Sequence, residues 1–139
     1  MKAQGLAALA VLALMGCQQS AQAPDFFDKT WYLDSREAGD LLAGASAPGG
    51  ITLTLQADGR LAGRSGCNNY FAGYQLGEDN SLAVSQIGST RKACMGPIMS
   101  AEYRYLERLN KAEKVETRGD SLMLYSQGQS EPLLFRLSR

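Results

Sequence analysis

The chain has 139 residues and a mass of 15.0 kDa, with 45% apolar and 20% charged residues, the balance of one globular domain. Its 14 basic residues equal its 14 acidic residues, so the composition gives no net charge that favours nucleic acid, and we expect no nucleic-acid partner. The absence of histidine excludes histidine-based catalytic triads, HExxH zinc sites and haem ligation by imidazole.

The N-terminus has the pattern of an export signal. An apolar run from Gly5 to Gly16 follows Lys2, and at about 1.5 Å per residue it is too short to cross the ~30 Å core of a bilayer. The run ends at Leu14-Met15-Gly16-Cys17, which resembles the lipobox of bacterial lipoproteins, whose cysteine is acylated and becomes the first residue of the mature chain. We predict a lipoprotein signal peptide over residues 1–16 and lipid attachment at Cys17.

The residues after Cys17 are small, polar and uncharged, a composition typical of a flexible tether. We assign residues 17–28 to the lipidated N-terminus and this tether. Gln18 resembles the sorting signal that directs lipoproteins of enteric bacteria to the outer membrane, so we expect an anchor there, with the domain facing the periplasm. In the alternative, cleavage after Ala21 or Ala23 releases a secreted protein without a lipid.

Residues 29–139 have the pattern of a small antiparallel β domain. Residues 51–55 alternate apolar and polar side chains, residues 57–59 supply a turn, and residues 60–64 return as a second strand. Shorter strands are expected at residues 31–33, 70–76, 82–84, 115–117, 122–125 and 133–137. We predict an α+β fold with seven or eight mainly antiparallel strands in a barrel-like sheet and one packed helix.

The helix is expected at residues 98–111, because apolar residues recur there at spacings of three and four: Ile98, Ala101, Tyr105, Leu109 and Ala112. Its other face carries the charged residues, which we interpret as a solvated surface: Glu102, Arg104, Glu107, Arg108 and Lys111. Residues 35–50 are rich in glycine and predict a loop with one helical turn around residues 37–42.

The most specific motif is Ser65-Gly66-Cys67-Asn68-Asn69-Tyr70-Phe71-Ala72-Gly73-Tyr74, followed by Thr90-Arg91-Lys92-Ala93-Cys94. These strings resemble the signatures of the META domain family, typified by heat-inducible HslJ-like lipoproteins. The resemblance implies a compact antiparallel β fold with a packed helix, similar to a pilotin-type lipoprotein, and implies no defined chemistry.

Glycine and asparagine tolerate left-handed backbone, so residues 66–69 are interpreted as a corner between strands that turns Cys67 inward. Tyr70 and Tyr74 then share one strand face and pack into the core. The alternative is a ligand-binding corner that uses Asn68 and Tyr70.

Two cysteines remain once Cys17 is acylated, and in an oxidising envelope we expect Cys67 and Cys94 to form a disulfide. The alternative is a pair of buried reduced thiols. A metal site would need further soft or imidazole ligands, so we expect neither a metal nor a cofactor.

Three enzyme motifs are considered and rejected. Ser89-Thr90-Arg91-Lys92 fits the S-x-x-K pattern of penicillin-binding proteins but lacks the S-D-N and K-T-G partners. Residues 63–66 are too short for a phosphate-binding loop. Glu113 and Glu116 are interpreted as ordinary surface charges.

The predicted function is therefore that of a non-catalytic envelope lipoprotein, with a stress-associated binding or envelope-integrity role, held to the membrane by its lipid. The alternative is a protein-directed module, either a pilotin-like chaperone or an inhibitor of an envelope hydrolase, which would contact an envelope protein through a loop such as residues 35–50. A hydrolase is the third and least favoured hypothesis.

Overall fold

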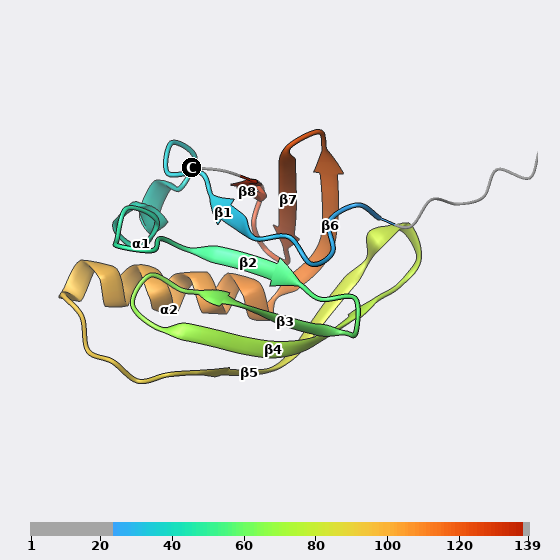
Figure 1. The fold of residues 1–139 in the computed structure, drawn as a ribbon. Coiled ribbons are helices and arrows are strands. Elements are labelled where there is room, and N and C mark those ends of the chain that lie inside the picture. Colours follow the sequence, from blue (N-terminus) through green and yellow to red (C-terminus); the bar gives the residue numbers. More distant parts are fainter. Residues whose placement is uncertain (1–23, 138–139) are drawn as a thin grey trace, which may run out of the picture.

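The structure is a computed structural model that describes residues 24–137 (Figure 1). Its strands form where apolar and polar residues alternate. The strands in the described part are β1 (Trp31–Leu33), β2 (Thr52–Leu55), β3 (Arg60–Arg64), β4 (Asn69–Leu76), β5 (Leu82–Ser89), β6 (Ala112–Arg118), β7 (Ser121–Ser126) and β8 (Leu133–Arg136). The helices are α1 (Leu42–Ala45) and α2 (Gly96–Asn110), with single 3-10 turns η1 (Gly39–Leu41) and η2 (Glu78–Asn80).

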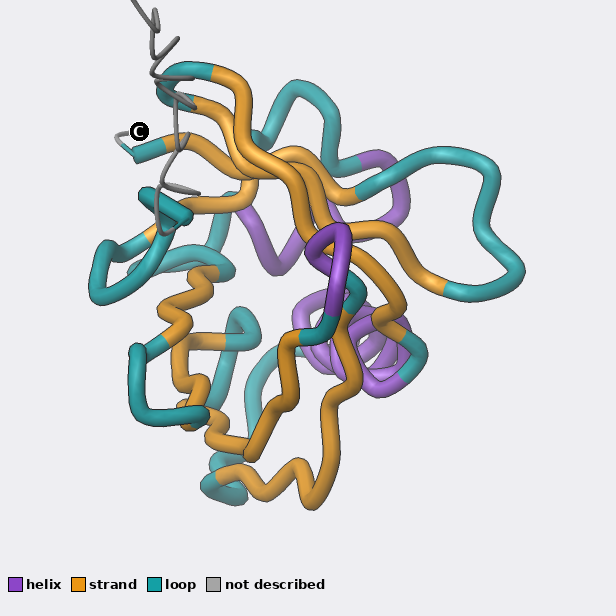
Figure 2. The backbone as a smooth tube through the Cα atoms, turned by 90° about the vertical axis from the view of Figure 1, so that its right-hand side faces the viewer, coloured by secondary structure: helices purple, strands orange, loops and turns teal. Residues whose placement is uncertain are grey.

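All neighbouring strands pair antiparallel in one sheet of order β5-β4-β3-β2-β1-β8-β7-β6. The two edges of this sheet approach each other, because Ser81, just before β5, forms an isolated bridge with Lys114 of β6. The sheet therefore curls into a nearly closed barrel, and Figure 2 shows the strands wrapped around the interior. The predicted α+β class, with a barrel-like sheet and one packed helix, is confirmed.

Helix α2 joins the two halves of the sheet through its apolar face. Ala101, Tyr105 and Leu109 are fully buried, at the spacing predicted for the core-facing side. The Tyr105 ring packs edge-on against Tyr70 of β4 and Phe135 of β8, with centroids 5.6 and 6.5 Å away. The helix thus fixes the distance between strands that are far apart in the sheet order.

Strand β5 is longer than the three residues expected at 82–84. It continues to Ser89, and its pairing with β4 shifts register between Phe71 and Gly73. Gln86 has a positive φ of 56°, which marks the irregularity on β5. Such a bulge interrupts the alternation of apolar and polar residues, so the period-two pattern ends there while the strand does not.

The folded domain starts before residue 29, where the sequence analysis placed its boundary. Phe26 is fully buried, and its carbonyl oxygen accepts a hydrogen bond of 3.1 Å from Trp31 Nε1. Phe27 bridges to Leu55 of β2, and the backbone N–H of Asp28 donates to the carbonyl of Leu55. These residues, which had been assigned to the tether, therefore extend the sheet. The predicted signal peptide and Cys17 lie outside the described residues.

The glycine-rich segment at residues 35–50 packs onto the domain. It forms η1, within the range of the helical turn expected around residues 37–42, and continues as α1, and Leu41 is fully buried. A side chain at Gly44 would come within 3.1 Å of the Cβ of Ala101, so α1 lies directly against α2. The segment is therefore a folded cover over the helix with exposed residues such as Leu42, and its glycines permit this close contact.

Candidate functional site

The signature motif forms the corner between β3 and β4. Ser65, Cys67 and Asn68 are all buried. Gly66 has φ of 109°, and a Cβ there would lie 3.0 Å from the Cα of Gly44 on α1. Only glycine combines this backbone conformation with such a close approach. The corner interpretation made from the sequence agrees with this geometry.

Glu102 is the centre of the corner, although the sequence analysis placed it on the solvated face of the helix. That interpretation is wrong, because Glu102 is 5% exposed and points from α2 into the corner. Its Oε2 accepts hydrogen bonds from the Ser65 hydroxyl at 2.7 Å and from the backbone N–H groups of Cys67 and Asn68 at 3.2 and 2.7 Å. Its Oε1 accepts from the Asn68 side chain at 2.7 Å.

These donors decide the ionisation of Glu102. Burial by itself raises the pKa of the carboxyl, but the hydrogen bonds from Asn68, Ser65 and Cys67 favour the charged form and bring the pKa below its ordinary value. The group is therefore a carboxylate at neutral pH, with donors on both of its oxygens.

The Asn68 side chain connects the corner to the segment that follows β5. Its Oδ1 accepts from the Thr90 hydroxyl at 2.9 Å and from the Lys92 backbone N–H at 2.6 Å. Its Nδ2 donates to the Lys92 carbonyl at 3.2 Å and to Glu102. An asparagine amide has two donors and two acceptor lone pairs, and all of them are used here. Asn68 therefore presents no free polar atom to a ligand.

A disulfide between Cys67 and Cys94 adds a covalent link between the same two segments, with a Cα–Cα distance of 6.0 Å. Thr90 and Cys94 of the second signature string thus both hold the loop before α2 against the corner.

Tyr70, the second residue of the ligand corner considered above, is also enclosed. It is 1% exposed, its hydroxyl donates to the Thr52 carbonyl at 2.7 Å, and it accepts from the Tyr105 hydroxyl at 2.8 Å. Burial raises the pKa of both tyrosines well above the ordinary range. The geometry gives Asn68 and Tyr70 structural roles.

The rejected enzyme motifs have ordinary surroundings. Ser89 ends strand β5 in register with Tyr70, and Lys92 lies exposed in the following loop, so the two residues do not share a helix. Glu116 pairs with Lys114 at 2.6 Å and accepts from the Tyr125 hydroxyl at 3.1 Å. Within residues 24–137 no group of three or more Cys, Asp and Glu side chains is placed to hold a metal ion.

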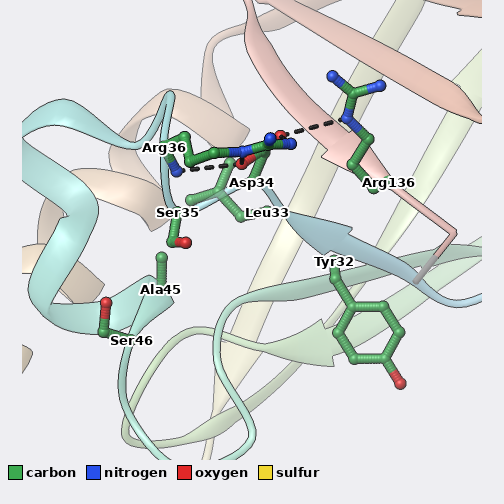
Figure 3. A pocket seen from close by; sticks show the side chains of 8 residues that line it. All are labelled: Tyr32, Leu33, Asp34, Ser35, Arg36, Ala45, Ser46 and Arg136. Atoms are coloured by element: carbon green, nitrogen blue, oxygen red, sulfur yellow. Dashed lines mark hydrogen bonds and ion pairs between the residues drawn. The ribbon is translucent and has the colours of Figure 1, made fainter. Parts of the chain in front are cut away.

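A cavity of about 550 Å³ lies beside the end of β1, between α1 and β8 (Figure 3). Its lining residues are Tyr32, Leu33, Asp34, Ser35, Arg36, Ala45, Ser46 and Arg136. Asp34 is at the centre of this group, and its carboxylate accepts from the guanidinium groups of both Arg36 and Arg136. The hydrogen bonds from Arg36, opposed in part by burial, hold the pKa of Asp34 well below its usual range.

This cavity has no signal in the local sequence pattern. Arg36 falls in the glycine-rich loop expected at residues 35–50, Asp34 directly precedes that loop, and Arg136 lies 102 residues beyond Asp34. The Asp-x-Arg spacing predicts a local ion pair at most. Only the pairing of β1 with β8 brings the second arginine to the same carboxylate.

The sequence model of the META domain family matches residues 24–138, which includes every element described above. The chain belongs to the META domain family. The resemblance inferred from the two signature strings is thereby confirmed, and the start of the match at residue 24 agrees with the buried position of Phe26. No curated protein matches this META domain protein.

Solved structures share the fold. A protein from Burkholderia xenovorans, solved by NMR, is 28% identical over 87% of this chain and 95% of its own, with a TM-score of 0.57. A DUF4847 family protein from Bacteroides vulgatus, solved by crystallography, is 18% identical over 82% of this chain and 95% of its own, with a TM-score of 0.58. The second likeness concerns the fold alone. In this META domain the signature residues build the corner, and the cavity lies apart from them.

Proposed function

We propose that this protein is a non-catalytic binding protein, lipid-anchored in the bacterial cell envelope, which acts through its surface rather than through a reactive group. The supporting observation is that the buried polar side chains of the corner and of the cavity wall all have hydrogen-bond partners within the domain. Glu102 and Asn68 direct their hydrogen bonds to each other and to neighbouring residues, and Asp34 is neutralised by two arginines. These groups stabilise a rigid scaffold, and neither a general base nor an activated nucleophile results from their arrangement.

The proposed anchor is Cys17, supported by the lipobox-like string and the short apolar run before it. No helix within residues 24–137 is long and apolar enough to span a bilayer. Two or three acyl chains, at about 0.8 kcal/mol per buried CH₂, would give stable attachment where a single chain does not. The outer-membrane address suggested by Gln18 is part of the same proposal.

The test is fractionation of cells that express Cys17→Ser, with Ser20→Ala as a neighbouring control. We expect the wild-type and Ser20→Ala proteins to incorporate labelled palmitate and to stay in the membrane fraction after a high-salt wash. Cys17→Ser should do neither. Membrane retention of Cys17→Ser, or absence of label in the wild type, would contradict the anchor.

A protein-directed function is the second candidate, and one feature of the surface favours it. Three large apolar residues are exposed on or beside the helices: Leu42 by 50%, Tyr103 by 71% and Met95 by 75%. Helix α1 and the start of α2 lie at the end of the domain opposite the place where the described chain begins (Figure 1). An N-terminal anchor would therefore leave this end turned away from the membrane, where an envelope protein could reach it.

Capture of partners from solubilised envelopes distinguishes the two candidates. A protein-directed module should retain a partner that Tyr103→Glu loses and that Phe71→Ser keeps, since Phe71 is comparably exposed, by 59%, on β4. Equal capture by both variants, or by neither, would argue against this candidate.

A further inference from the structure

Two guanidinium groups converge on one carboxylate in the cavity beside β1. Asp34 Oδ2 lies 2.8 Å from Arg36 Nη2 and 3.2 Å from Arg136 Nε, and Asp34 Oδ1 accepts from the backbone N–H and Nε of Arg36 at 3.0 and 3.1 Å. The Asp34 side chain is 5% exposed, whereas those of Arg36 and Arg136 are 77% and 41% exposed. Each oxygen of the Asp34 carboxylate therefore accepts two hydrogen bonds. Two guanidinium cations thus face one carboxylate anion at the cavity wall.

Both guanidinium groups keep unused donors. A guanidinium has five N–H bonds. The hydrogen bonds of Arg36 to Asp34 use Nε and one N–H of Nη2, which leaves both N–H bonds of Nη1 and one of Nη2. Arg136 uses Nε for Asp34 and one N–H of Nη1 for the Ser121 hydroxyl at 2.7 Å, which leaves the other N–H of Nη1 and both N–H bonds of Nη2. Figure 3 shows the two groups on either side of Asp34.

The chain contains a second Asp-x-Arg turn that serves as an internal comparison. Asp58 accepts from the backbone N–H and Nε of Arg60 at 3.1 and 2.8 Å, the same local arrangement as in Asp34 and Arg36. This turn is complete with one arginine, its aspartate is 51% exposed, and neither residue lines the cavity. An Asp-x-Arg turn therefore forms without a second arginine and without a cavity beside it. Arg136 and the cavity are additional features of the turn at Asp34.

The rest of the cavity wall is suited to the body of an organic molecule. Leu33 and Ala45 contribute apolar surface, and Ser35 and Ser46 contribute hydroxyl groups. Its volume of about 550 Å³ is within the usual range of small-molecule sites. Glu37, whose charge acts on Arg36, is not part of the lining.

We propose that this cavity binds a small organic anion, whose carboxylate or phosphate group is held by Arg36 and Arg136 while its apolar part rests on Leu33 and Ala45. Arginine is the residue best suited to such oxyanions, because its planar N–H groups match their oxygens. The proposal specifies the ligand class for the binding function proposed above, and it does not depend on the anchor at Cys17.

The test is an NMR titration of the purified, ¹⁵N-labelled protein with hexanoate, hexyl phosphate, inorganic phosphate and hexylammonium. We expect at least one of the two hexyl anions to saturate shifts at residues 32–36, 45–46 and 136, and to bind more tightly than inorganic phosphate. The variant to compare is Arg36→Gln, which leaves Asp34 paired with Arg136, and the matched control is Arg60→Gln. Arg36→Gln should weaken binding by about tenfold, the effect of losing one charge-assisted contact, and Arg60→Gln should not.

Several results would overturn the proposal. One is the absence of saturable shifts with both hexyl anions, and another is equal binding of hexylammonium, which would indicate an apolar hollow without charge selection. Equal affinity for inorganic phosphate would remove the role of Leu33 and Ala45, and equal binding by Arg36→Gln would remove the role of the arginine. None of these outcomes would change the membrane fractionation of Cys17→Ser, so failure of the anion site and failure of the anchor are distinguishable.

Discussion

Glu102 accepts hydrogen bonds from both the backbone N–H and the side-chain amide of Asn68, each at 2.7 Å, across 34 residues of sequence. The first residue is on α2 and the second is in the corner between β3 and β4. This pair fixes the helix to the sheet by polar contacts, and it keeps a charged group buried by surrounding it with donors.

Replacement of Glu102 by glutamine should lower the free energy of unfolding by about 2–4 kcal/mol, because buried donors from Ser65, Cys67 and Asn68 lose their charged acceptor. Urea denaturation measures this loss. Glu107→Gln is the control, since its side chain is 49% exposed and paired only with Lys111 on the same helix. We expect it to change stability by less than about 0.5 kcal/mol. Similar losses in the two variants would argue against the corner network.

Between pH 3 and 8, stability should depend on pH only on the acid side. Asp34 and Glu102 both have a lowered pKa in the folded protein, so their stabilisation is complete above their ordinary values of about 3.9 and 4.3 and is lost as the pH falls through the lower folded-state values. With no histidine, we expect a flat unfolding free energy from about pH 5.5 to 8 and a decline below about pH 4.5. The deficit of Glu102→Gln should shrink over that decline. Urea denaturation at pH 3, 5 and 7 measures this deficit. A deficit that stays constant or grows at pH 3 would contradict the prediction.

The Tyr70 hydroxyl is predicted to contribute through buried hydrogen bonds. Tyr70→Phe leaves the Thr52 carbonyl and the Tyr105 hydroxyl without this partner, at a cost of about 1–3 kcal/mol. Tyr103→Phe, on the exposed side of α2, should have almost no effect. Thermal unfolding compares the two variants, and equal melting temperatures would contradict the role assigned to Tyr70.

Gly63 provides the space through which the Tyr70 hydroxyl reaches β2. A Cβ at Gly63 would collide with the Thr52 carbonyl oxygen and lie 2.8 Å from the Tyr70 hydroxyl. Gly63→Ala should therefore destabilise the protein by about 2–3 kcal/mol through overpacking. Gly73→Ala on β4 is the matched strand control, because its nearest contact would be 3.4 Å from the Ser85 hydroxyl. A neutral Gly63→Ala would show that β2 and β3 can separate without cost.

The disulfide between Cys67 and Cys94 closes a loop with a sequence separation of 27 residues. In the chain-entropy account it contributes roughly 3.5 kcal/mol, so Cys67→Ser should lower stability by about 2–5 kcal/mol. Reductant should destabilise the wild type and leave the double variant Cys67→Ser, Cys94→Ser unchanged. Mass spectrometry under non-reducing conditions checks the bond itself, and two free thiols in protein isolated from cells without reductant would rule it out.

The sequence by itself determined the elements whose evidence is local. Alternation at residues 51–55 and the helical spacing of Ala101, Tyr105 and Leu109 predicted strand and helix, because each pattern reports one face of one element. The signature strings gave the family, and the glycine and asparagine at residues 66–69 gave the corner. None of these inferences depends on which residues pack against the element.

Only the tertiary structure decided which polar residues are buried and which come together. Glu102 belongs to the charged face of its helix by periodicity, and it becomes buried because the corner from β3 and β4 supplies donors at that position. Arg136 joins Arg36 at Asp34 because β8 pairs with β1 across 102 residues. A local pattern records the hydrophobicity of a residue but not its partner, and for charged groups the partner determines whether burial is favourable.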